Sequence, residues 1–342
     1  MAAASNTSAD LDHSDLDHTD LDHPDLDLRL DPDHTGPPSL PPIFSVSEAL
    51  AHGLTRKQLR GKAFVVVGHG LRCRADATPT YADLVRAHQR ACPHSVATHT
   101  TAARLWRMWL PPEWETELVH LSRSRVHGGA PTRSGVVGHE RSERTGVVHR
   151  AGIAVATPVA TLVALAAAGL GADDLVAAGD SLMQSADGPA AERDPGTHPR
   201  YTREVLAERL ALAAGLRGGR RAMEAFEHMR PGVDSRPETL VRLALVHAGF
   251  PEPAVNPRVE LADGSHPRVD LVWAEPRICV QYEGDHHRTD LAQWRRDIER
   301  DRRMQAEGWL VIRVAASFFT TRGRQDFLAD VASAFAQRGV PV

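Results

Sequence analysis

The last third of the chain carries the pattern that most restricts its fold. Between residues 235 and 342, apolar residues recur with helical spacing and then with strand alternation, and glycines or polar stretches mark the boundaries. The predicted segments in chain order are helix 235–247, strands 255–261, 268–273 and 277–282, helix 291–307, strand 309–314 and helix 325–337. This αβββαβα order predicts a domain of mixed α and β structure over residues 235–342.

Three polar positions in these strands predict a metal site. Asp270 lies in the second strand, and Gln281 and Glu283 lie in the third. Gln281 and Glu283 are two residues apart and share a face, and an adjacent antiparallel strand can place Asp270 beside them. Two carboxylates and an amide oxygen are hard ligands of the kind that Mg²⁺ or Mn²⁺ accepts. A metal held in this way leaves positions for water and phosphate, which is one way to activate water against a phosphodiester.

Four motifs in this region resemble a known nuclease family. They are Val269-Asp270-Leu271-Val272, the run from Val280 to His287, the run from Arg296 to Asp301 and the run from Gly308 to Val314. Together they resemble the very-short-patch-repair-like (Vsr-like) endonuclease domains of the PD-(D/E)XK superfamily, including the group called domain of unknown function 559. The resemblance implies a restriction-endonuclease-like fold and a Mg²⁺-dependent or Mn²⁺-dependent hydrolase acting on DNA.

The resemblance also implies roles for single residues. Asp270 corresponds to the metal-binding aspartate, Gln281 and Glu283 to the E-x-K or E-x-D positions, His287 to a histidine of the repair endonucleases, and Glu238 to the acid of the first helix. Gln281 stands where the family usually has an acidic residue, so the site lacks one negative charge and should bind a metal ion more weakly. Glu283 replaces the superfamily's lysine, so His287 is our candidate for the general base. Such a site could also be catalytically silent.

Some of these residues have structural explanations. Glu238 follows Ser235 as S-x-x-E, which is the pattern of a helix capping box. Asp297, Arg300 and Asp301 lie within about one helical turn, and pairing among themselves on a solvated face would explain them.

The region from residue 43 to 73 predicts a winged helix. The stretch 46–59 reads as a helix, a turn at Gly53 and a second helix capped by Thr55, and 64–73 reads as two short strands around a glycine turn. In the functional interpretation, the second helix places three side chains in a DNA major groove, namely Arg56, Lys57 and Gln58. In the structural interpretation, the helical hairpin packs internally or contacts a partner.

A second resemblance covers residues 43–185. It includes the stretch 95–105 and a helix that begins at Thr157-Pro158. These segments resemble the N-terminal half of abortive-infection antitoxin-like regulators. The resemblance implies a regulatory or DNA-binding module without catalytic residues.

The remaining segments complete a five-part organisation. Residues 1–42 repeat an Asp-Leu-Asp-His pattern and then become Pro-rich, which predicts a disordered acidic tail, and weak metal chelation by its histidines is the less favoured interpretation. Residues 186–200 predict a linker, and 201–234 a helical connector with helices at 204–214 and 220–229.

Charge is unevenly distributed along the chain. Residues 1–34 hold ten Asp and one Arg, which gives this segment a net charge of −9. Because the whole chain has a net charge of −4, residues 35–342 carry about +5. Nearly all of the positive charge is arginine, which suits phosphate contacts, although arginine bias in a GC-rich genome explains it equally well. The predicted phosphate-binding residues near the metal site are Arg288, Arg295, Arg296 and Arg303.

Several classes of protein are disfavoured by the composition. Cys73, Cys92 and Cys279 are odd in number and widely spaced, which argues against a disulfide framework or a cysteine zinc site. The first thirty residues lack an apolar signal segment, and the uncharged stretch 151–172 reads as a core helix begun by Thr157-Pro158. We expect a cytoplasmic protein without a membrane span or a small-molecule cofactor, and the sequence leaves its oligomeric state open.

Three functional hypotheses follow from the sequence. The first is a metal-dependent endonuclease that the N-terminal helix-turn-helix delivers to DNA. The second is a catalytically inactive DNA-binding transcriptional regulator of antitoxin type. The third is a protein-interaction scaffold that uses the cationic part of the chain.

Overall fold

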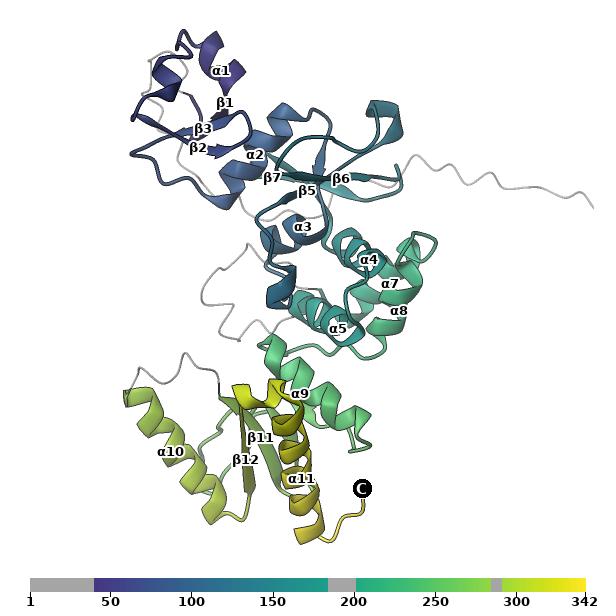
Figure 1. The fold of residues 1–342 in the computed structure, drawn as a ribbon. Helices are drawn as coiled ribbons and strands as arrows, with labels where there is room; N and C mark the ends of the chain where they lie inside the picture. The colour runs from purple at the N-terminus through teal and green to yellow at the C-terminus, as the bar shows by residue number, and fades with distance from the viewer. Residues whose placement is uncertain (1–39, 184–200, 284–290) are drawn as a thin grey trace, which may run out of the picture. The chain divides into compact units, whose positions relative to one another are not determined.

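The computed structural model describes residues 40–183, 201–283 and 291–342, and it describes side chains in all of these except 291–297 (Figure 1). The described residues contain helices and three sheets, with strand orders β1-β3-β2, β6-β5-β4-β8-β7 and β12-β11-β10-β9. The prediction of a mixed α and β fold is confirmed. The predicted tail and the 186–200 linker fall outside the described residues, except for the last residues of the tail.

The N-terminal sheet contains the predicted hairpin and one strand that the sequence did not indicate. Its strands are β1 (Ile43–Ser45), β2 (Phe64–Gly68) and β3 (Leu71–Arg74), and helix α1 (Val46–Ala51) follows β1. Both β1 and β2 pair antiparallel with β3. A capping box begins α1, because Ser45 Oγ accepts from the Glu48 N–H at 3.1 Å while Glu48 Oε2 accepts from the Ser45 N–H at 2.6 Å.

The predicted second helix of the helix-turn-helix is wrong. Thr55 and Gln58 do form a reciprocal cap, with the Thr55 N–H donating to Gln58 Oε1 at 2.7 Å and the Gln58 N–H donating to Thr55 Oγ1 at 3.2 Å. Only a single 3₁₀ turn, η1 (Gln58–Arg60), follows, and Gly61 leaves it in extended backbone. Leu59 is the one buried side chain of this turn, so no apolar face stabilises a longer helix.

A five-stranded sheet follows and is covered by helices. The strands of this sheet are β4 (Val96–Ala97), β5 (Val119–Arg123), β6 (Val136–Glu140), β7 (Val147–Arg150) and β8 (Ile153–Ala156). The helices of the same region are α2 (Tyr81–Ala91) and α3 (His99–Leu105). Strands β5 and β6 are parallel, with Val119 opposite Val136. Short 3₁₀ turns η2 (Pro112–Trp114) and η3 (Arg125–His127) lie between these elements.

The predicted core helix is present. α4 (Pro158–Ala168) begins with Pro158 at its first position, Thr157 Oγ1 accepts from the Ala160 N–H at 3.3 Å, and Gly169 ends it with a φ of 97°. It packs with α5 (Ala172–Asp180), α7 (Arg203–Ala213) and α8 (Gly219–Phe226), and these last two confirm the predicted helices with slightly shifted ends. In the part of the chain that the structure describes, no helix has the length and apolarity needed to cross a membrane.

The C-terminal region shows the predicted order of elements. They are α9 (Arg236–His247), β9 (Ala254–Val255), β10 (Leu271–Trp273), β11 (Ile278–Glu283), α10 (Leu291–Ala306), β12 (Leu310–Ala315), η6 (Ala316–Phe319) and α11 (Thr321–Gln337). The predicted strand 255–261 is much too long. Pro257 and Pro267 lack the N–H that a regular ladder needs, so beyond Val255 the pairing continues only irregularly, through an isolated bridge between Arg258 and Arg268 and single backbone hydrogen bonds such as that from the Val259 N–H to the Pro267 oxygen at 2.9 Å.

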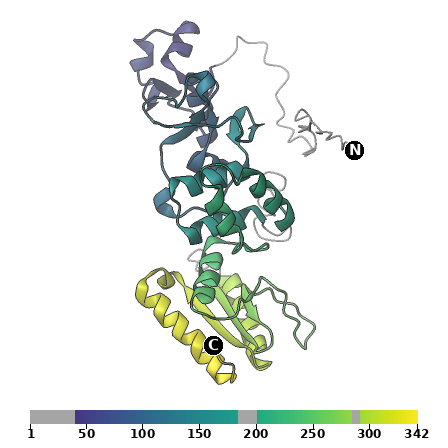
Figure 2. The same cartoon turned by 90° about the vertical axis from the view of Figure 1, so that its right-hand side faces the viewer.

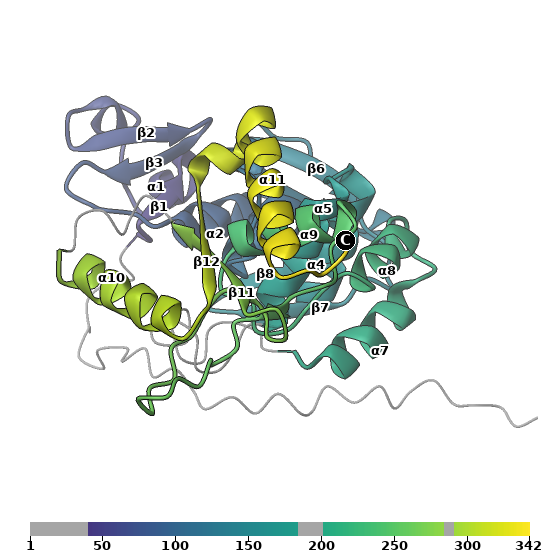
Figure 3. The same ribbon diagram turned by 90° about the horizontal axis from the view of Figure 1, so that it is seen from below.

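The two faces of the C-terminal sheet are covered by different helices. Leu240 of α9 and Phe335 of α11 pack in one core, whereas Met304 of α10 packs in another with Val272 and Cys279. α10 and α11 accordingly lie on opposite sides of β12 when this region is seen from below (Figure 3), and the view in Figure 2 shows α11 alongside the sheet. Strand β11 is antiparallel to β10 and parallel to β12.

Candidate functional site

Asp270, Gln281 and Glu283 come together on the face of the sheet that α10 covers. Leu271 is opposite Val280 in the antiparallel register of β10 and β11, so Asp270, which directly precedes β10, lies next to Gln281. The Tyr282 N–H donates a hydrogen bond of 2.7 Å to Asp270 Oδ2. Strand alternation places Gln281 and Glu283 on the same face as Cys279, which packs against α10.

The Asp270 carboxyl holds a proton unusually tightly. Burial raises its pKa to about 7, and the nearby charge of Glu238 adds to the rise, while the Tyr282 N–H and Arg300 act in the opposite direction. The carboxyl therefore ionises near neutral pH, and a cation bound next to it would favour its ionised form.

Glu238 lies beside this group and stabilises the start of α9, although its carboxylate accepts from the Asp234 N–H and not from the Ser235 N–H that the predicted capping box requires. Its carboxylate is 8% exposed and accepts from Ser235 Oγ at 2.7 Å, from the Asp234 N–H at 3.1 Å and from Asn256 Nδ2 at 2.8 Å. Burial raises the pKa of Glu238. The Asn256 N–H in turn donates to the Asp270 backbone oxygen at 2.8 Å, so Glu238 holds the strand end through Asn256.

Gln281 carries an unsatisfied acceptor. Its Oε1 is buried and has no hydrogen-bond partner among the described residues. Leaving such an atom unpaired costs about 1–3 kcal/mol, so a buried orphan of this kind suggests a missing ligand. An amide oxygen next to a carboxylate is a donor that Mg²⁺ or Mn²⁺ accepts, and in this respect the residues fit the expected metal.

Two residues that the sequence analysis did not assign to the site lie next to it. Arg313 is opposite Gln281 in the parallel register of β11 and β12. Its Nε and Nη2 donate to Asp301 Oδ2 at 2.8 and 2.6 Å, and its Nη1 contacts Glu283. Asp301 also pairs with Arg300 at 3.3 Å, as the sequence indicated, but it is only 8% exposed and so does not lie on a solvated face. The sequence feature that could have identified Arg313 is its charge inside the otherwise apolar strand 310–315.

The structure does not describe the side chains of most of the other residues predicted near the metal site. His287 and Arg288 lie outside the described residues, and Arg295 and Arg296 belong to the part of α10 whose side chains are not described. Arg303 forms an ion pair with Asp263 at 3.3 Å.

The three residues predicted to contact a DNA major groove, Arg56, Lys57 and Gln58, are exposed, but they do not lie on a helix that could enter a groove. Arg56 and Lys57 occupy a turn. The amide oxygen of Gln58 is used by the Thr55 cap.

A histidine cluster in the five-stranded sheet was missed entirely. His99 begins α3, His120 lies in β5 and His139 lies in β6. Among the described residues, this is the one group of three His, Cys, Asp or Glu side chains whose ligand atoms all lie within 4.8 Å of one another. No short motif predicts this cluster, because the histidines are far apart in the sequence. They meet through the parallel pairing of β5 with β6 and the hydrogen bonds that join the start of α3 to β5.

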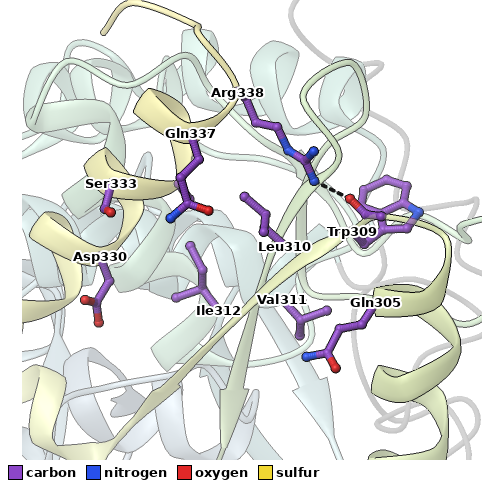
Figure 4. Close-up of a pocket in the computed structure, with 11 residues that line it drawn as sticks. Gln305, Trp309, Leu310, Val311, Ile312, Asp330, Ser333, Gln337 and Arg338 are labelled. Atoms are coloured by element: carbon purple, nitrogen blue, oxygen red, sulfur yellow. Dashed lines mark hydrogen bonds between the residues drawn. The ribbon is translucent and has the colours of Figure 1, made fainter.

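A cavity of about 640 Å³ lies along β12, between the end of α10 and α11 (Figure 4). Its lining includes Gln305, Trp309, Ile312 and Gln337, and Arg338 donates to the Gly308 backbone oxygen at its rim. None of the candidate metal-binding residues lines this cavity, so it is separate from the candidate site.

Comparison with known proteins does not name a function. No family model matches the chain. Two uncharacterized proteins of Mycobacterium tuberculosis, from strains CDC 1551/Oshkosh and H37Rv, are each 29% identical to it over 98 residues, which is 28% of this chain. The chain covers 36% of the length of these relatives.

Proposed function

We propose that the C-terminal region is a Mg²⁺-dependent or Mn²⁺-dependent endonuclease that hydrolyses phosphodiester bonds in DNA, with a restriction-endonuclease-like fold of the Vsr-like group. The observation that carries the proposal is the grouping of Asp270, Gln281 and Glu283 on one face of two paired strands. The αβββαβα order, with β11 parallel to β12, supports it.

The metal-binding residues in this proposal are Asp270, Gln281 and Glu283. A bound ion would polarise the phosphate and lower the pKa of an attacking water. Asp270 is oriented by the Tyr282 N–H, and the unpaired Oε1 of Gln281 is free to accept a ligand. Glu238 positions the strand end through Asn256, and His287 takes the role of general base.

Arg313 takes over the positive charge that the lysine supplies in the family that the chain resembles. It is opposite Gln281 on the neighbouring strand and contacts the Glu283 carboxylate. A guanidinium at this place holds Glu283 in position and attracts the phosphate backbone.

The same contact favours a second candidate function, a catalytically inactive DNA-binding regulator of antitoxin type. Arg313 neutralises the charge of Glu283 and of Asp301, and Gln281 contributes no charge of its own. In a regulator, the protein binds DNA and its nuclease fold has lost catalysis.

A cleavage assay distinguishes the two functions. Supercoiled plasmid and single-stranded DNA are incubated with Mg²⁺ and then Mn²⁺, using the wild-type chain, Asp270→Ala and a matched control, Asp326→Ala, whose side chain is 69% exposed on α11. The endonuclease proposal expects cleavage by the wild type and the control and none by Asp270→Ala. Equal cleavage by all three contradicts the site, and no cleavage of any substrate favours the regulator, which then must show salt-dependent DNA binding.

A further inference from the structure

We propose that His99, His120 and His139 form a binding site for a divalent transition metal of the Zn²⁺ type, separate from the Mg²⁺ site of the proposed endonuclease. The three ligand nitrogens lie within 4.8 Å of one another, and each of the three residues is half-buried.

The spacing of two of the nitrogens is close to that of a zinc site. His120 Nδ1 lies 3.0 Å from His139 Nε2. Two imidazole nitrogens bound to the same tetrahedral Zn²⁺, each at 2.0–2.1 Å, are about 3.3 Å apart. In the structure the two nitrogens share a hydrogen bond, and an ion would replace its proton once the rings rotate so that both lone pairs point at the metal.

The third histidine has a buried nitrogen without a partner. Nδ1 of His99 is inaccessible to solvent and accepts or donates no hydrogen bond among the described residues. The His99 ring stacks on the His139 ring, with their centroids 3.7 Å apart. A metal ion would satisfy this nitrogen, which nothing else in the described structure does.

The backbone holds His99 in an uncommon conformation toward the cluster. Its φ is 48°, in the left-handed region that non-glycine residues rarely occupy. Strained residues of this kind persist where the surrounding structure fixes them, and they concentrate at functional sites.

Hydrogen bonds lock the start of α3 onto β5. The His120 N–H donates to Thr101 Oγ1 at 2.8 Å, and the His120 backbone oxygen accepts from the Thr98 N–H at 3.0 Å. The same Thr101 hydroxyl is 3.0 Å from the Tyr81 hydroxyl. The ligands thus project from elements whose relative position is fixed, as a preorganised metal site requires.

The chemistry of the cluster selects the class of metal. Three neutral imidazoles suit Zn²⁺ and its neighbours Co²⁺, Ni²⁺ and Cu²⁺, whereas Mg²⁺ requires oxygen ligands. Three histidine ligands leave a fourth position of the tetrahedron for water.

Metal titration of the full chain tests the proposal. Zn²⁺ binding is measured by calorimetry for the metal-stripped wild type, for the double variant His120→Asn/His139→Asn and for His149→Asn, an exposed histidine on β7 of the same sheet. We expect the wild type and His149→Asn to bind one more equivalent of Zn²⁺ than the double variant. Identical isotherms for all three would overturn the site.

A second measurement tests the site without substituting any of its three histidines, so its result does not depend on whether the double variant folds. In the variant His13→Asn/His18→Asn/His23→Asn, the histidines of the acidic repeat are gone and the triad is intact. Co²⁺ added to this variant should give the intense visible absorption of a tetrahedral site, displaced by Zn²⁺ and not by Mg²⁺. Weak octahedral absorption alone would refute the proposal.

The site stands independently of the endonuclease. The equivalent of Zn²⁺ that His120→Asn/His139→Asn loses should remain in Asp270→Ala, whether or not the wild type cleaves DNA. Loss of that same equivalent in Asp270→Ala, with full retention in the double histidine variant, would place the ion in the C-terminal region and contradict the histidine site.

Discussion

Asp180 and Arg242 form a buried ion pair that joins α5 to α9. Asp180 Oδ2 lies 3.3 Å from Arg242 Nη2, and the two side chains are 0% and 1% exposed. Asp180 also accepts from Thr239 Oγ1 at 2.8 Å and from the Arg230 N–H at 2.7 Å. The first helix of the C-terminal region is therefore bound to the helices that precede it through a polar network inside the protein.

Removing one partner of this pair should strongly destabilise the protein. Arg242→Met leaves Asp180 buried without its countercharge, and the cost of an uncompensated buried charge is about 3–5 kcal/mol. Urea unfolding measures the change in the free energy of unfolding. Arg322→Met is the matched control, because Arg322 and its partner Asp326 are 91% and 69% exposed, and it should change stability by less than about 1 kcal/mol. Similar values for both variants would contradict the structural role.

His88 should make the protein sensitive to acid. It is 2% exposed, and burial, with the charge of Arg133, lowers its pKa from 6.5 to about 4. Between pH 6.5 and 4 the unfolded chain binds a proton at this residue and the folded chain does not. The folded state therefore loses stability as the pH falls through this window, by up to about 3 kcal/mol.

The variant His88→Leu isolates this contribution. Its unfolding free energy should fall less steeply than that of the wild type between pH 6.5 and 4, as followed by urea titration at several pH values. His149→Leu, which changes an exposed histidine, should retain the wild-type slope. Parallel curves for the wild type and His88→Leu would exclude His88 as a source of the acid sensitivity.

Gln281→Glu should strengthen metal binding at the proposed endonuclease site. It restores a negative charge next to Asp270, and affinity for a hard cation increases with ligand charge, here by about tenfold. Calorimetry with Mn²⁺ measures the affinity. Asp270→Asn should weaken it by a similar factor, and unchanged Mn²⁺ binding in both variants would argue against a metal at these residues.

Arg313 and Asp301 should be energetically coupled. The guanidinium makes two hydrogen bonds to a carboxylate of a residue that is 8% exposed, so Arg313→Met leaves this nearly buried charge with the longer 3.3 Å contact to Arg300 Nε. A double-mutant cycle with Asp301→Asn should give an interaction energy of about 1–3 kcal/mol. An interaction near zero would mean that solvent screens the pair.

The order and type of the C-terminal elements followed from the sequence alone. Apolar periodicity and capping residues act locally, so Ser235, Thr157 and Gly308 mark helix ends wherever the surrounding chain is placed. Strand alternation likewise assigned Gln281 and Glu283 to one face, because side chains two positions apart on a strand point the same way. The second N-terminal helix failed because a correct cap cannot sustain a helix that buries only Leu59.

Only the tertiary structure decided which distant residues meet. Strand pairing placed Arg313 opposite Gln281, and the parallel register of β5 and β6 joined His120 to His139, although nothing in their local sequence indicates a contact. Burial likewise set the pKa of Asp270 near 7 and withdrew Asp301 from solvent. Local sequence determines elements and faces, whereas register, burial and the field of neighbouring charges arise only when the elements pack.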